Sequence, residues 1–78
     1  MKITVLGYGI QGRAQSLNLR DSGHKVIIGN LNDKYAKIAK KDGFEVFNFK
    51  EAVKKTKLIF ILLPDELQDK VISKYIIP

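Results

Sequence analysis

The sequence predicts an α/β fold: part of a doubly wound parallel sheet of about four strands, with helices on both faces. Short apolar segments alternate along the chain with segments of helical periodicity, and a glycine-rich turn directly follows the first apolar segment. Strands that alternate with helices are joined by right-handed crossovers, which favour a parallel sheet in the order 3-2-1-4. The length of 78 residues leaves room for one small domain, which would hold half of such a sheet.

The first half of the chain predicts two strands, each followed by a helix. The segment Lys2–Leu6 (KITVL) is apolar and β-branched and ends at a glycine, which is typical of a buried parallel strand. Helical spacing then predicts a helix over Ile10–Ser22, which Gly23 ends in a left-handed conformation. A second strand is expected at Lys25–Gly29 (KVIIG), and the turn Asn30–Asp33 (NLND) supplies the N-cap of the next helix.

The second half repeats this alternation. Phe44–Phe47 predicts a third strand near a sheet edge, and a short helix is expected over Lys50–Lys55. The most apolar segment, Leu58–Leu63 (LIFILL), predicts a strand buried on both faces. The last helix is expected to have Asp65 as its N-cap and Gln68 in a capping box.

Composition narrows the class of protein. Hydrophobic residues make up 45% and charged residues 28%, as in an ordinary globular domain. Cysteine is absent, which excludes disulfides and thiolate chemistry and fits a cytoplasmic setting. The net charge of +6 comes from scattered lysines without aromatic interleaving, which favours solvated helix faces over a nucleic-acid surface. The longest apolar stretch is too short for a membrane span, so no membrane partner is expected.

Three glycines carry the strongest functional signal. Gly7, Gly9 and Gly12 form G-x-G-x-x-G between the first predicted strand and helix, the context in which this pattern indicates dinucleotide binding. Gly7 would permit the tight turn, Gly9 would let the main chain approach a pyrophosphate, and Gly12 would let the helix pack closely. The amides at the helix start would bind the anion. The alternative, a turn that binds nothing, does not require three glycines.

The end of the second predicted strand lacks the acidic residue that commonly holds the ribose 2′-hydroxyl of NAD. Gly29 and Asn30 stand there instead. Asp33 follows, beside Asn32 and Lys34, within reach of an adenosine ribose. Asp33 is also the expected N-cap of the next helix, and the two roles are compatible because a carboxylate has two oxygens.

The remaining polar candidates are weaker. His24, the single histidine, is expected in a surface turn rather than as a general base, and Arg20 with Asp21 as a surface pair. Asp65 and Gln68 follow the fourth predicted strand, where helix capping and cofactor contact are both compatible with their position.

Four segments together resemble ketol-acid reductoisomerase (acetohydroxy acid isomeroreductase), in order and spacing. They are GYGIQGRAQSLNLRDSG (Gly7–Gly23), VIIG (Val26–Gly29), DGFEV (Asp42–Val46) and ILLPDELQ (Ile61–Gln68). The resemblance covers nearly the whole chain and implies a Rossmann-like, incomplete amino-terminal dinucleotide-binding domain over residues 1–78. The glycine loop alone would also fit another β-hydroxyacid or imine reductase, but the LNLRDSG and LLPDELQ stretches disfavour that reading.

The resemblance implies an oxidoreductase of isoleucine and valine biosynthesis. Such an enzyme converts 2-acetolactate or 2-aceto-2-hydroxybutyrate to a 2,3-dihydroxy acid by Mg²⁺-dependent alkyl migration and hydride transfer. The family's metal and substrate residues lie in a helical carboxyl-terminal domain, and its catalytic histidine follows the fifth strand. We therefore expect no catalytic or metal residue here and no activity from this chain alone. A free-standing dinucleotide-binding or protein-interaction module remains the alternative.

By the same resemblance, Tyr8 to Gln11 would contact the cofactor phosphates, and Asp65 to Gln68 would line its ribose and nicotinamide side. Ile10 departs from the family pattern, in which a serine is frequent. The expected cofactor-binding residues are Gly7, Tyr8, Gly9, Ile10, Gln11, Gly12, Asn30, Asn32, Asp33, Lys34, Pro64, Asp65, Glu66, Leu67 and Gln68.

The loop after the second predicted strand bears on the choice between NADH and NADPH. Members that use NADPH usually carry an arginine and serines there, and residues 30–35 (NLNDKY) contain neither. A carboxylate at Asp33 would repel a 2′-phosphate, so NADH is favoured, although Lys34 acts in the opposite direction. The unpaired edge of the fourth strand further predicts self-association or partial unfolding.

Overall fold

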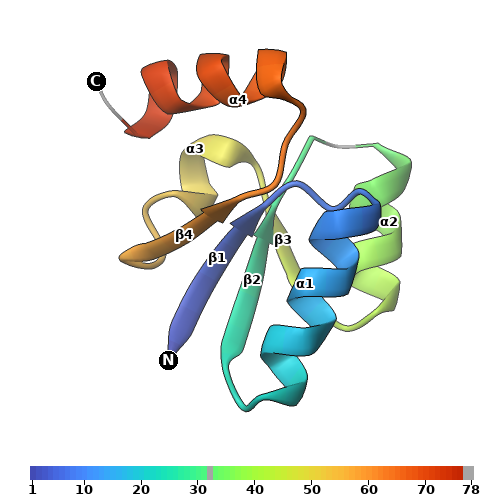
Figure 1. Cartoon of the computed structure of the whole chain (residues 1–78). Helices are drawn as coiled ribbons and strands as arrows, with labels where there is room; N and C mark the ends of the chain where they lie inside the picture. Colours follow the sequence, from blue (N-terminus) through green and yellow to red (C-terminus); the bar gives the residue numbers. More distant parts are fainter. Residues whose placement is uncertain (32, 77–78) are drawn as a thin grey trace.

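Four parallel strands form one sheet in the order β3-β2-β1-β4, within residues 1–31 and 33–76, which this computed structural model describes (Figure 1). The strands are β1 (Lys2–Leu6), β2 (Lys25–Gly29), β3 (Glu45–Phe47) and β4 (Leu58–Ile61). The predicted fold class and strand order are confirmed. In the register, Leu6 lies opposite Gly29 on one side and Ile61 on the other, so three strands end at the same level.

Helices cover both faces of the sheet, as predicted. On one face lie α1 (Ile10–Asp21) and α2 (Lys34–Lys41); on the other lie α3 (Phe49–Ala52) and α4 (Asp65–Val71), which continues as a π-helix over Ile72–Ile76 (Figure 1). None of the described helices has the length and apolar character needed to cross a membrane.

The core has two parts because side chains alternate across each strand. On the α1–α2 face the buried cluster consists of Ile3, Val5, Tyr8, Val26, Ile28, Ala39 and Phe44. On the α3–α4 face it consists of Leu6, Phe49, Ala52 and Val71. Thr4 is also fully buried, and its hydroxyl lies 2.7 Å from the Thr56 hydroxyl and donates to the Ala52 carbonyl. The sheet is therefore packed on both sides where β1 and β2 meet.

A glycine follows the end of both α1 and α2, and after α2 the helix end takes up the first residue of the predicted third strand. Gly23 and Gly43 have φ of +92° and +96°, a conformation that favours glycine. After α2, the Phe44 amide donates to the Ala39 carbonyl at 3.1 Å, the hydrogen bond of a Schellman motif. Phe44 therefore belongs to the helix end, and β3 begins one residue later than predicted, at Glu45.

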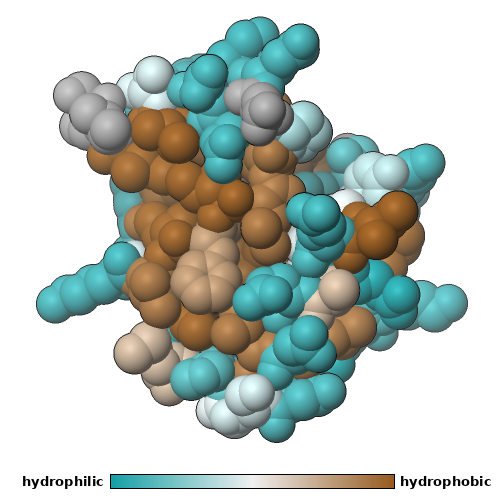
Figure 2. Space-filling model, in the orientation of Figure 1, coloured by the Kyte–Doolittle hydropathy of each residue, from teal (hydrophilic) through white to brown (hydrophobic). Residues whose placement is uncertain are grey.

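The fourth strand differs from its prediction. It ends at Ile61 instead of Leu63, and its residues are half-buried or exposed, with Leu58 38% exposed. The prediction of a strand buried on both faces was wrong because β4 is the edge strand of the described sheet and α1 covers it only in part. Figure 2 shows apolar side chains gathered where α4, β4 and β1 lie, while mostly hydrophilic ones cover α1 and α2.

Two helix starts also differ from prediction. The helix expected over Lys50–Lys55 runs over Phe49–Ala52, because the Asn48 side chain caps it by accepting the Glu51 amide at 2.8 Å. The capping box of the last helix was wrong: Asp65 is its first helical residue, and the N-cap position is Pro64, which has no side-chain cap hydrogen bond.

Candidate cofactor-binding site

Two adjoining hollows open at the carboxyl ends of β1, β2 and β4, and together we call them the crevice. One, of about 270 Å³, lies between the glycine loop and the loop after β2; the other, of about 600 Å³, runs along the start of α1. Both are lined by Gly9, Tyr35, Leu62, Leu63 and Pro64. A crevice at this end of the strands is where doubly wound sheets bind ligands.

The glycine loop forms one wall of the crevice. Gly7 has φ of +99°, and a Cβ on Gly12 would run into the Gly7 carbonyl oxygen, so α1 packs directly on the loop. A Cβ on Gly9, in contrast, would have no atom within 4 Å. The first amides of an α-helix lack partners within the helix, and α1 begins at Ile10, immediately after this open position. The wall therefore suits a pyrophosphate that approaches the main chain.

Close packing explains why the last residue of β2 is a glycine and not an acidic residue. A Cβ on Gly29 would lie 2.5 Å from Leu6 Cδ2 and 2.7 Å from the Ala52 Cβ, so close packing excludes any side chain there. Asn30 follows with 9% of its surface exposed, and its side-chain amide donates to Oδ1 of Asp33 at 2.9 Å and to the Leu31 carbonyl at 3.0 Å. The carboxylate nearest to this loop is thus displaced to position 33.

Asp33 is the N-cap of α2, as predicted. Its Oδ1 accepts the amides of Tyr35 at 2.9 Å and Ala36 at 3.2 Å, in addition to the Asn30 side chain. Among the described residues, every hydrogen bond to this carboxylate falls on Oδ1, and Asp33 lines the crevice. The other oxygen, Oδ2, is therefore available to a ligand hydroxyl.

Most of the residues predicted to bind the cofactor lie along the crevice. These are Gly7, Tyr8, Gly9, Ile10, Gln11, Gly12, Asn30, Asp33, Pro64, Leu67 and Gln68. Lys34 and Glu66 are exposed and do not line it. Asn32 and the Asp65 side chain lie outside what the structure describes. Gln68 crosses to β4, where its Nε2 donates to the Ile61 carbonyl at 3.4 Å.

Sequence reasoning missed a polar cluster beneath the glycine loop. The buried Tyr8 hydroxyl donates to Oδ2 of Asp42 at 2.6 Å, and Arg13 Nε donates to the same oxygen at 2.9 Å. These two hydrogen bonds, with that from Arg13 the larger influence, hold the pKa of Asp42 below its usual value. Burial, followed by the hydrogen bond to Asp42, raises the pKa of Tyr8 to about 12. Any contact of Tyr8 with a ligand in the crevice would therefore come from its main chain.

The predicted surface pair of Arg20 and Asp21 was wrong. Arg20 instead donates to the Asp42 carbonyl at 2.5 Å and lies over the Phe44 ring, 4.4 Å from its centroid. His24 lies in the turn before β2, at the opposite end of the strand from the crevice.

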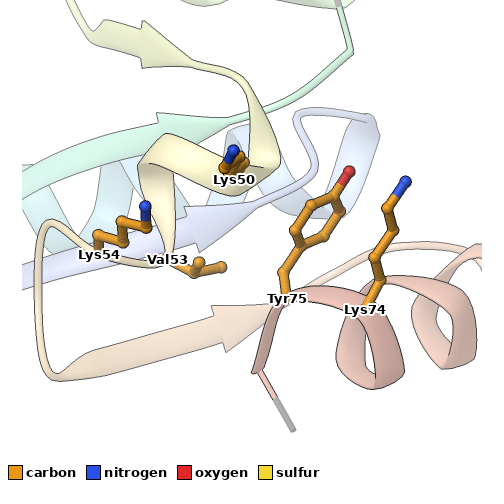
Figure 3. A pocket seen from close by; sticks show the side chains of 5 residues that line it. All are labelled: Lys50, Val53, Lys54, Lys74 and Tyr75. Atoms are coloured by element: carbon orange, nitrogen blue, oxygen red, sulfur yellow. The ribbon is translucent and has the colours of Figure 1, made fainter. Parts of the chain in front are cut away.

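A further hollow of about 420 Å³ lies between α3 and the last helical segment, away from the glycine loop (Figure 3). Lys50, Val53 and Lys54 line it from one side, and Lys74 and Tyr75 from the other. Tyr75 projects toward α3, with its ring 6.4 Å from that of Phe49. Among the described residues, no three or more His, Cys, Asp or Glu side chains group as metal ligands, in this hollow or elsewhere.

Comparisons with known proteins agree with this arrangement. The family model for the acetohydroxy acid isomeroreductase NADPH-binding domain matches residues 1–78. A ketol-acid reductoisomerase (NADP(+)) of Petrotoga mobilis is 56% identical over 77 residues, and putative ketol-acid reductoisomerase 3 of Saccharolobus solfataricus is 49% identical over 76; each match covers 97% of this chain and 23% of the relative.

A solved structure shows the same likeness. The NADH-preferring ketol-acid reductoisomerase from an uncultured archaeon superposes with a TM-score of 0.91 at 41% identity, over 96% of this chain and 24% of that one. The chain thus spans about a quarter of the length of the relatives it matches. It belongs to the acetohydroxy acid isomeroreductase (ketol-acid reductoisomerase) family and corresponds to its amino-terminal NADPH-binding domain.

Proposed function

We propose that the crevice holds a reduced nicotinamide dinucleotide for a ketol-acid reductoisomerase. The observation that carries this proposal is the open position at Gly9, where the main chain and the unpartnered amides at the start of α1 face the crevice. A pyrophosphate in this place would gain hydrogen bonds from the amides and a favourable interaction with the helix dipole. The matching family model and the names of the relatives support the same cofactor class.

The reaction proposed for the whole enzyme is the conversion of 2-acetolactate to a 2,3-dihydroxy acid. A reduced nicotinamide supplies the hydride, and Mg²⁺ assists the alkyl migration. The residues of this chain would bind and orient the cofactor, with Asp33 and Asn30 toward the adenosine ribose and Pro64 to Gln68 toward the nicotinamide side. We expect the chain by itself to be inactive, and we propose a cytoplasmic location for the enzyme.

Within this function, we propose that the chain prefers NADH. The free Oδ2 of Asp33 would accept a hydrogen bond from a ribose hydroxyl and would repel a 2′-phosphate by roughly 1 kcal/mol. The NADH preference named for the archaeal structure supports this choice. The NADPH-binding family description and the NADP(+) in the name of the Petrotoga mobilis relative point the other way.

A direct titration tests the proposed function. NADH fluorescence should change saturably on addition of the purified chain, with one cofactor bound per chain. ADP-ribose, which retains the pyrophosphate and adenosine, should displace NADH. Failure to bind NADH and NADPH would contradict the proposal, and binding of NADPH alone would contradict the stated preference.

A further inference from the structure

Hydrogen bonds to one oxygen of Asp42 link the glycine loop, α1 and the end of α2. Asp42 is the C-cap of α2, and its Oδ2 accepts both the Tyr8 hydroxyl at 2.6 Å and Arg13 Nε at 2.9 Å. Tyr8 stands between the first two glycines of the motif, and Arg13 directly follows the third. The two donors therefore flank the segment that is proposed to contact the pyrophosphate.

Packing and hydrogen bonds hold the Tyr8 and Asp42 side chains of this cluster together. Tyr8 is 1% exposed, and its ring packs edge-on against Phe44 with 5.8 Å between centroids. Arg20 holds the other side of Asp42 through the backbone carbonyl and also covers Phe44. Hydrogen bonds to a charged group that is partly shielded from water are about twice as strong as neutral ones. Loss of the Asp42 carboxylate would thus alter the position of Tyr8 and Arg13, and with them the glycine loop.

We propose that Asp42 is a positioning residue for cofactor binding, which acts through Tyr8 and Arg13 to hold the glycine loop against the start of α1. The inference rests on the proposed dinucleotide binding and goes beyond it. Asp33 caps the other end of α2, so this one helix carries the ribose carboxylate at its start and the anchor of the pyrophosphate loop at its end. The crevice would then keep a fixed distance between its two recognition points.

A merely structural role for Asp42 predicts something different. If the cluster only stabilised the fold, its loss would lower the unfolding temperature and leave ligand affinity unchanged wherever the chain stays folded. If it positions the loop, its loss would weaken only those ligands that contain the pyrophosphate. Adenosine lacks that group, whereas NADH contains it, so the pair of ligands separates the two roles.

The experiment compares Tyr8→Phe and Asp42→Asn with the wild type. Tyr75→Phe and Asp69→Asn are matched controls, because Tyr75 and the exposed Asp69 lie outside the crevice and the cluster. Affinities for NADH and for adenosine are measured by NMR titration, at a temperature where circular dichroism shows each variant folded. We expect each cluster variant to bind NADH about three- to tenfold more weakly, because Tyr8→Phe removes one charge-assisted hydrogen bond and Asp42→Asn takes the negative charge from two. Adenosine affinity should stay within about twofold, as should both affinities of the controls.

The double variant completes the test. Because Tyr8→Phe removes the hydrogen bond that Asp42→Asn weakens, the double variant should lose less NADH affinity than the sum of the single losses. If Tyr8→Phe does not fold, the affinities of Asp42→Asn decide between the positioning role and the structural role, since this variant keeps the whole Tyr8 side chain. Unchanged NADH affinity in a folded cluster variant, or an equal loss for adenosine, overturns the positioning role. A wild type that binds neither NADH nor NADPH overturns the proposed function itself.

Discussion

The Asn30 side-chain amide donates a 2.9 Å hydrogen bond to Oδ1 of Asp33 and thereby orients this carboxylate toward the crevice. The same oxygen already caps α2, so the hydrogen bond fixes which oxygen faces the ligand. Asn30 stands where many NAD-binding folds have the acidic residue itself. In the proposed function, recognition of the ribose would thus be divided between the Asn30 amide, which positions the carboxylate, and Asp33, which contacts the ribose.

Replacement of Asp33 tests the cofactor preference. Asp33→Ser removes the charge that opposes a 2′-phosphate, so the ratio of NADH to NADPH affinity should fall about fivefold, which corresponds to about 1 kcal/mol. Both cofactors are titrated against the wild type and the variant at low salt, with Asp69→Ser as the control for loss of a surface charge. A wild type that favours NADPH, or a ratio that Asp33→Ser leaves unchanged, would show that Asp33 does not set the preference.

The lowered pKa of Asp42 predicts an acid-dependent loss of stability. The folded state binds this proton less tightly than the unfolded state, whose carboxyl has the ordinary value of 3.8. The stabilisation by the Asp42 carboxylate is therefore fully present above that value and disappears as the pH falls through the lower pKa of the folded chain. Urea unfolding of the wild type and Asp42→Asn should differ most at neutral pH and converge in acid. A difference that is independent of pH would contradict this assignment.

The raised pKa of Tyr8 predicts a loss of stability at alkaline pH. Its pKa is raised from 10.0 to about 12, so the folded state retains the phenol proton after the unfolded state has lost it. The resulting stabilisation is fully present below pH 10 and is lost as the pH rises through about 12. The difference in tyrosinate absorbance between the wild type and Tyr8→Phe should show a midpoint near 12. A midpoint near the ordinary value would mean that the hydroxyl is neither buried nor held by Asp42.

The free edge of β4 should make the chain self-associate. Leu58 is 38% exposed on this strand, and no other described strand pairs with its outer side. Leu58→Lys should shift sedimentation toward the monomer, because charge at an edge strand opposes pairing. Ile38→Lys is the matched control, since Ile38 is 39% exposed on α2. A wild type that stays monomeric at all concentrations, or an equal effect of both substitutions, would refute the role of this edge.

The sequence predicted best what local residues determine. Strand order followed from the alternation of apolar runs with helices, and the positive φ at Gly23 followed from a glycine placed after a helical segment. The burial of β4 was mispredicted because an apolar run does not reveal whether a neighbouring strand exists. The hydrogen bond between Tyr8 and Asp42 joins residues 34 positions apart, and no local pattern encodes such a pair.

We infer that the glycine loop receives a dinucleotide at the open position of Gly9. Gly9→Val would place a branched side chain in the space where the pyrophosphate is expected, whereas Ala14→Val places the same side chain on the exposed side of α1. NADH titration of the two variants and the wild type is the most direct test. We expect saturable NADH binding by the wild type and Ala14→Val, and at least about a tenfold loss of NADH affinity in Gly9→Val. Equal NADH affinity in Gly9→Val and Ala14→Val would contradict it.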